Sequence, residues 1–194
     1  MNIFDFLYKK IMFWSTGSSA HRYLCALSFA ESSFFPIPPD VMLIPISLAR
    51  RDKIWFLASI TTISSVLGGI LGYLIGYFIF DSIEPWLQES AYWNSYENSK
   101  IWFSKWGIWA ILLAGFSPIP YKIFTIAAGM TGVNLFGFIL FSVIGRGARF
   151  FLIALLIYFG GENINNMIEK YINRIGWSII FIIFMIFLYF WESS

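Results

Sequence analysis

The sequence predicts an all-α integral membrane protein that contains an inverted repeat. Hydrophobic residues make up 58% of the 194-residue chain and charged residues only 12%, about half the charged share of a typical soluble domain. Two apolar stretches, 54–80 and 133–160, exceed the ~20 residues that a helix needs to cross a bilayer. A proline phrase occurs twice, as F-F-P-I-P at 34–38 and as F-S-P-I-P at 116–120, which indicates two copies of one structural unit.

Two segments flank the membrane domain, which we place at 20–174. The N-terminal segment, 1–19, mixes aromatic residues with charged ones and has no small-residue cleavage site. It therefore predicts an amphipathic, interfacial helix over 2–16 and not a secretory signal. The C-terminal segment, 175–194, is almost free of charge up to its last residues and predicts a transmembrane helix.

The first repeat is predicted over 20–80. An apolar arm at 20–34 ends in a break at 35–40, because closely spaced prolines cannot continue an α-helix. A second arm follows at 41–50, and a transmembrane helix at 54–80 completes the unit.

The second repeat, 106–160, follows a surface linker at 81–105. The linker carries four acidic residues, two lysines and Pro85, a composition typical of helices outside the membrane core. Arm, break and arm recur over 106–130, and the second transmembrane helix covers 133–160.

The arms are too short to cross a membrane singly, because about 10 to 15 residues reach only half to two-thirds of the way. Two arms joined by a break form either a re-entrant hairpin or one kinked span, and we expect the hairpin. Backbone groups in a break have no helical partner, so the break must face protein or water and not lipid. The breaks are expected to involve Pro36, Pro38, Pro39, Pro118 and Pro120.

Glycines are placed for close contact between helices. Gly68 and Gly72 have the small-xxx-small spacing of packed transmembrane helices, and Gly129 and Gly145 are their candidates in the second repeat.

Ionisable side chains are rare in the apolar segments, and a charge at the membrane centre costs about 2.5–3.5 kcal/mol on insertion scales. Glu31 and Asp40 precede and end the first break, and Lys122 ends the second. Arg146 and Arg149, at i and i+3, share one face of a helix. Structural ion pairing alone could explain these charges, but their position at the breaks favours a functional site.

This charge set suits an anionic head group together with a proton. Lys122, Arg146 and Arg149, with the backbone N–H groups that start each arm after a break, suit a phosphate group. Glu31 and Asp40 are the candidate proton-coupling residues, because a desolvated carboxyl binds a proton more readily than one in water.

Other functional classes are not expected. One cysteine and one histidine cannot build a metal cluster of those residues, and a net charge of +2 gives no argument for nucleic acid. The sequence has no P-loop, GxSxG, HExxH or CxxC pattern, so we expect no enzyme, no cofactor and no metal.

At these residues the chain resembles the DedA family, also called SNARE-associated or VTT-domain membrane proteins. The match covers about 30–160 and rests on Glu31, the first break with Asp40, and the run F-S-P-I-P-Y-K-I-F-T-I-A-A-G-M-T-G-V-N at 116–134. The P-I-P-Y-K signature is similar to that of a subgroup of short bacterial members. The family's second break usually carries two arginines, whereas this sequence has only Lys122 there, and Arg146 or Arg149 would supply the other charge.

The resemblance implies a multi-pass protein of a bacterial inner membrane that serves membrane-lipid homeostasis. It also implies a flippase or scramblase type of transporter for an anionic lipid, such as undecaprenyl phosphate or a phospholipid, with proton coupling. Two alternatives stay open at this point, a small-ion or proton exchanger and a non-transporting scaffold for membrane assembly.

Overall fold

The computed structural model describes residues 17, 19–35, 37–90, 93–117 and 120–160. This part of the chain is helical and contains no strand, so the predicted all-α class is confirmed. The expected interfacial helix at 2–16 and the expected C-terminal transmembrane helix lie outside the described residues. The helices are α2 (Ala20–Ser33), α3 (Asp40–Ala49), the short 3-10 helix η1 (Arg51–Lys53), α4 (Ile54–Gln88), α5 (Trp93–Phe116), α6 (Tyr121–Met130) and a last helix, Leu135–Gly160.

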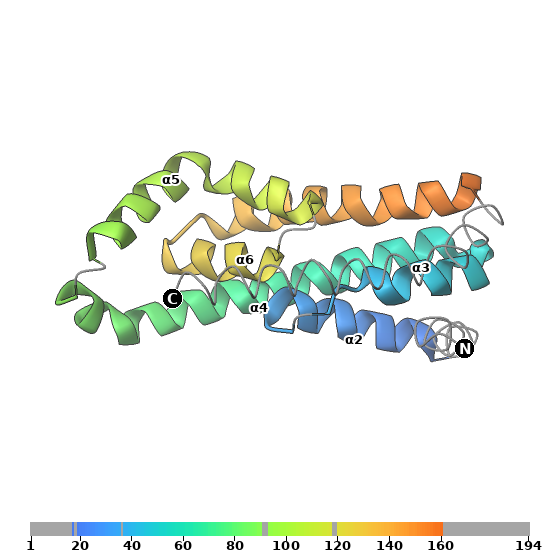
Figure 1. The fold of residues 1–194 in the computed structure, drawn as a ribbon, viewed down its shortest axis with the longest axis horizontal. Coiled ribbons are helices and arrows are strands. Elements are labelled where there is room, and N and C mark those ends of the chain that lie inside the picture. The colour runs from blue at the N-terminus through green and yellow to red at the C-terminus, as the bar shows by residue number, and fades with distance from the viewer. Residues whose placement is uncertain (1–16, 18, 36, 91–92, 118–119, 161–194) are drawn as a thin grey trace, which may run out of the picture.

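Helix α4 runs the length of the molecule, and the shorter helices lie along it (Figure 1). Helices α2 and α3 accompany the half of α4 that begins at Ile54, whereas α6 accompanies the other half. The backbone of α2 contacts α4 at Gly68, and that of α6 contacts it at Gly76. The last helix returns along the bundle from the α6 end toward the α3 end.

Each proline phrase interrupts the helical chain, as predicted. Helix α2 ends with the N–H groups of Phe34 and Phe35 both donating to the carbonyl of Ala30, at 2.9 and 2.8 Å. Helix α3 then begins at Asp40, directly after Pro39, and α6 begins at Tyr121, directly after Pro120. Helix α3 begins one residue earlier than the arm expected at 41–50, because proline is well tolerated next to a helix start.

The described residues of the expected linker at 81–105 are mostly helical and mostly exposed, and they extend the helices on either side. Helix α4 continues through Pro85 to Gln88, and α5 joins the charged stretch from Trp93 to the apolar arm that ends at Phe116. A proline removes one intrahelical hydrogen bond, which a long helix can survive. The change from polar to apolar residues along α5 therefore marks a change of surroundings and not the end of a helix.

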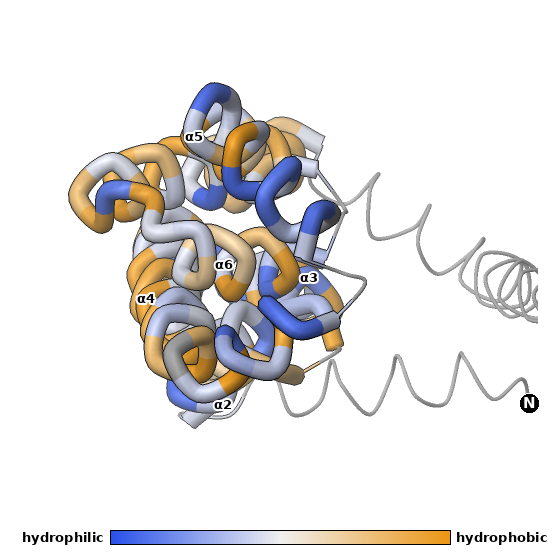
Figure 2. The backbone as a smooth tube through the Cα atoms, turned by 90° about the vertical axis from the view of Figure 1, so that its left-hand side faces the viewer, coloured by the Kyte–Doolittle hydropathy of each residue, from blue (hydrophilic) through white to orange (hydrophobic). Residues whose placement is uncertain are grey.

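Two helices are long and apolar enough to cross a membrane, Arg51–Phe80 and Leu135–Gly160. They agree with the two spans expected from the sequence. Only 39% and 28% of their most apolar stretches are buried, and large side chains such as Leu67 (52% exposed) and Phe159 (78% exposed) face outward. Apolar residues colour the outer turns of α4 in Figure 2, which suits a surface in contact with lipid.

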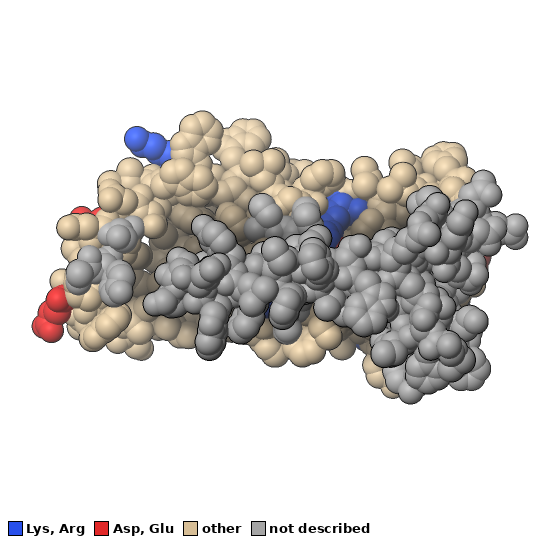
Figure 3. Space-filling view, viewed as in Figure 1, with Lys and Arg blue, Asp and Glu red and all other residues tan. Residues whose placement is uncertain are grey.

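The interior, in contrast, contains polar side chains. Charges are sparse on the face shown in Figure 3, apart from groups at one end and a basic group about halfway along. Inside the bundle, hydroxyl groups are frequent, and most of them bond to a carbonyl or to each other, as Ser28 does to the carbonyl of Thr61 at 2.9 Å. The buried polar side chains are Ser28, Ser32, Ser33, Ser47, Thr61, Thr62, Ser65, Thr125, Ser142 and Arg146.

Glycines allow the helices to approach closely. A Cβ at Gly68 would overlap the carbonyl of Phe29 in α2, and one at Gly72 would overlap the side chain of Thr125 in α6. A Cβ at Gly129 would overlap the carbonyl of Tyr73, and one at Gly145 would overlap the carbonyl of Leu112 in α5. Side chains at these positions would push the helices apart.

We expect Gly76→Ala to destabilise the protein by about 1–3 kcal/mol, the usual effect of overpacking a tight contact. Its new methyl group would overlap the backbone carbonyl of Ile126, which has no rotamer to move into. Gly147→Ala is the matched control, because a Cβ there meets only Thr62 Cγ2 at 3.7 Å, an ordinary contact. Thermal unfolding in detergent measures both, and equal stability of the two variants would contradict the packing described here.

Candidate functional site

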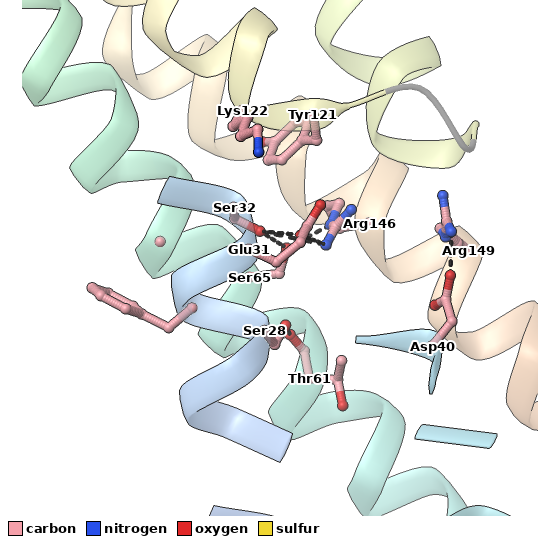
Figure 4. A network of polar contacts seen from close by, with 12 residues as sticks. Ser28, Glu31, Ser32, Asp40, Thr61, Ser65, Tyr121, Lys122, Arg146 and Arg149 are labelled. Carbon is pink, nitrogen blue, oxygen red and sulfur yellow. Dashed lines mark hydrogen bonds and ion pairs between the residues drawn. The ribbon is translucent and has the colours of Figure 1, made fainter. Parts of the chain in front are cut away.

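The five ionisable residues singled out in the sequence converge where the two breaks meet, near the middle of the bundle (Figure 4). They come from four separate elements: Glu31 from α2, Asp40 from the start of α3, Lys122 from α6, and Arg146 and Arg149 from the last helix. Two of these elements precede α4 in the chain and two follow α5.

Glu31 and Arg146 form a buried ion pair. Arg146 Nη2 donates to Glu31 Oε2 at 2.6 Å, and the two side chains are only 2% (Arg146) and 13% (Glu31) exposed. Ser32 Oγ donates to the same carboxylate oxygen at 3.0 Å, and Ser32 and Ser65 share a hydrogen bond of 2.7 Å. Arg146 Nε donates to Ser65 on α4, so three helices meet at this guanidinium.

Aromatic rings complete the enclosure of Arg146. Its guanidinium carbon lies 5.1 Å from the ring centre of Tyr121 and 4.8 Å from that of Phe150, within the range of cation–π attraction. The Tyr121 hydroxyl is itself bonded to Ser142 on the last helix. The first turn of α6 is thereby fixed to the helix that carries both arginines.

Asp40 and Arg149 form the second ion pair, on the more open side of the site. Arg149 Nη2 donates to Asp40 Oδ2, and its Nη1 donates to the carbonyl of Ser117. One guanidinium therefore holds the start of α3 and the second break together. Asp40 Oδ1 is buried and has no hydrogen-bond partner among the described residues.

Lys122, directly after the second break, bonds the chain at the start of the first break. Its Nζ donates to the carbonyls of Phe34 and Phe35, at 3.5 and 3.3 Å. These carbonyls lie at the end of α2, where helical partners are missing. Unlike the two arginines, Lys122 has no carboxylate partner within the described part of the chain.

The arrangement can bind an anion in exchange for a carboxylate. Both acids come from α2 and α3, all three bases come from α6 and the last helix, and the bases outnumber the acids by three to two. A guanidinium offers the same planar pair of donors to a carboxylate and to a phosphate. Protonation of either carboxyl would end its ion pair and leave the arginine available.

Sequence reasoning identified the charged residues, and the structure places them together. It did not assign the pairing, and it missed the neutral members of the network, Ser32, Ser65, Tyr121 and Ser142. A signal for two of them was present, because Ser28 and Ser32 on one helix and Thr61 and Ser65 on another are spaced i, i+4 and so share a helix face.

Arg149 is the residue that reaches the second break. The sequence left open whether Arg146 or Arg149 supplies the basic group missing there. Arg149 contacts the Ser117 carbonyl directly, whereas Arg146 is turned toward Glu31 and Ser65. No cluster of three or more His, Cys, Asp or Glu side chains that could hold a metal ion occurs in the described ranges.

Comparisons with known proteins give a family and two relatives. The VTT domain family matches residues 37–159. An uncharacterized protein of Haemophilus influenzae is 42% identical over 180 residues, which is 93% of this chain and 94% of the relative. A second uncharacterized protein, from Histophilus somni, is 42% identical over 188 residues, which is 97% of this chain and 98% of the relative. No solved structure matches the chain.

A double-mutant cycle tests the Glu31–Arg146 pair. Glu31→Leu and Arg146→Met should each destabilise the protein by about 3–5 kcal/mol, because each leaves a buried charge unpaired. The double variant should be more stable than the sum of the two losses predicts, with a coupling of about 0.5–3 kcal/mol. Thermal unfolding of the purified chain in detergent provides the four stabilities.

The control cycle combines Glu31→Leu with Arg22→Met. Arg22 is exposed near the start of α2, about two and a half turns from Glu31 by helix geometry, so these effects should add. Additive losses in the Glu31–Arg146 cycle as well would show that the two side chains do not form a pair.

Proposed function

The chain belongs to the VTT-domain family, also known as the DedA family, and on this premise we propose that it carries an anionic lipid across a membrane under the control of protons. The substrate class is a lipid-linked phosphate, such as a polyprenyl phosphate or a phospholipid. The chain would act as a transporter in a bacterial inner membrane and not as an enzyme.

The proposed topology is an inverted repeat of two re-entrant hairpins. Helices α2 and α3 would enter from one membrane face, and the apolar end of α5 with α6 from the other, so that both breaks meet at mid-membrane. This proposal is supported by the arrangement in Figure 1, where α2 and α3 lie along one half of α4 and α6 lies along the other. The bonds from Lys122 to the end of α2 support it too.

The observation that carries the functional proposal is the pairing of charges across the repeats. Every acid of the site is held by an arginine from the other repeat. An anionic head group that takes over the arginines would therefore loosen the contact between the two halves. Such a loosening is what alternation of access to a central site requires.

Protons would control this exchange through Glu31 and Asp40. A charged carboxylate would compete with phosphate for its arginine. A proton bound to the carboxyl would cancel that charge and weaken the ion pair, so that phosphate would bind more tightly. The predicted direction is therefore stronger lipid-phosphate binding in acid.

Lys122 and Arg149 would make the first contact with the phosphate. Both are more accessible than Arg146, since Arg149 is 17% exposed and Lys122 lies at the exposed side of the breaks. Arg146 would join after Glu31 has been protonated, because its guanidinium is otherwise enclosed. The order would couple substrate entry to proton uptake.

Transport of fluorescent polyprenyl phosphate in proteoliposomes, at several pH values, tests the proposal. The rate for the unaltered chain should rise as the pH falls. Glu31→Gln and Asp40→Asn should each flatten this pH dependence, since the amide carbonyl still accepts a bond from arginine but carries no charge. Glu84→Gln, which alters an acid outside the site that bonds Gln88, should leave the pH profile unchanged.

Binding measurements separate this proposal from its alternatives. Arg146→Ala and Lys122→Ala should each weaken binding of polyprenyl phosphate about tenfold, since a hydrogen bond to a charged group contributes about 1.5–3 kcal/mol. Unchanged affinity in both variants would contradict the phosphate site and favour a proton or small-ion exchanger. A scaffold would retain its function after neutralisation of Glu31 and Asp40.

A further inference from the structure

A second cavity lies at the end of the bundle, away from the paired charges. It opens where α2 begins, where α3 ends and where α4 begins, and its volume is about 400 Å³. None of its lining residues belongs to the central site. The described lining residues are His21, Ile46, Arg50, Lys53, Phe56 and Leu57.

The cavity combines basic groups with an apolar wall. Its three basic side chains come from three elements: His21 from the first turn of α2, Arg50 from the C-terminal end of α3, and Lys53 from η1. None of the described lining residues is acidic. The Arg50 side chain is already oriented, because its Nη2 donates to the carbonyl of Gly17 at 2.8 Å.

The apolar wall points to an amphipathic ligand. Ile46 and Leu57 are buried and form part of the core, whereas Phe56 is exposed on the outside of α4. The cavity also lies at the first residues of the membrane span Arg51–Phe80. At that level a bilayer presents its head groups, with the acyl chains running alongside the helix.

We propose that this cavity binds the phosphate head group of an anionic membrane lipid. The basic side chains hold the phosphate ester, and an acyl chain leaves along Phe56. Free inorganic phosphate carries the same kind of charge but has no apolar group that could contact the apolar wall. The proposal is independent of transport, because it concerns a resident lipid at the membrane surface and no residue of the central site.

Lipid binding to the full chain, purified in detergent, is measured by native mass spectrometry. The probes are phosphatidylglycerol and phosphatidylcholine of equal chain length, and inorganic phosphate is the competitor. Phosphatidylglycerol should bind more tightly than phosphatidylcholine, and millimolar inorganic phosphate should not displace it. Lys53→Gln should weaken phosphatidylglycerol binding about fivefold, the expected contribution of one basic residue near an anionic lipid.

Arg51→Gln is the matched control. Arg51 and Lys53 are both exposed, both lie in η1 and both carry one positive charge, but only Lys53 lines the cavity. The affinity of Arg51→Gln should change less than twofold. Neither substitution touches the buried core, so both variants should fold.

Three results would overturn the proposal. An equal loss of phosphatidylglycerol affinity in Lys53→Gln and Arg51→Gln would show that general surface charge, and not the cavity, attracts the lipid. Equal affinity for the two lipids would exclude recognition of an anionic head group. Displacement by inorganic phosphate would assign the site to the free anion and not to a lipid.

Discussion

A guanidinium that is almost completely enclosed needs a carboxylate beside it, because an unpaired charge in the interior costs several kcal/mol. Arg146 is such a group, and the structure around it follows from this need. Glu31 lies at the end of α2 nearest the first break and pairs with Arg146, and Ser65 on α4 accepts a bond from the same guanidinium. Tyr121 is the first residue of α6, directly after the second break, and its ring lies against Arg146. The ion pair therefore holds α2 against the last helix.

The glycines on α4 allow this meeting. Gly68 and Gly72 receive the backbone of α2, and Gly72 and Gly76 receive α6, so both short helices rest on one long helix. The breaks then lie close enough for Lys122 to bond the carbonyl of Phe35 and for Arg149 to bond that of Ser117. Side chains that would be costly in lipid thus satisfy one another and the ends of broken helices, as the bilayer demands.

Much of this fold could be predicted from the sequence, because its signals are local. The proline phrases predict the breaks, the apolar stretches predict the two spans, and the isolated charges are the side chains that converge. The pairing of Glu31 with Arg146 and of Asp40 with Arg149 could not be predicted, since it depends on how distant helices pack. The continuation of α4 through Pro85 was not predicted either, because the sequence does not show that a long helix survives the loss of one hydrogen bond at a proline.

The central claim is that phosphate and carboxylate compete for the same arginines, with a proton replacing the lost ion pair. Infrared difference spectra of the purified chain, recorded with and without a polyprenyl phosphate at one pH, test it most directly. The account predicts that ligand binding creates a protonated-carboxyl band, and that Glu31→Gln and Asp40→Asn each remove part of that band. Ligand binding that leaves the carboxyl region of the spectrum unchanged would contradict the account.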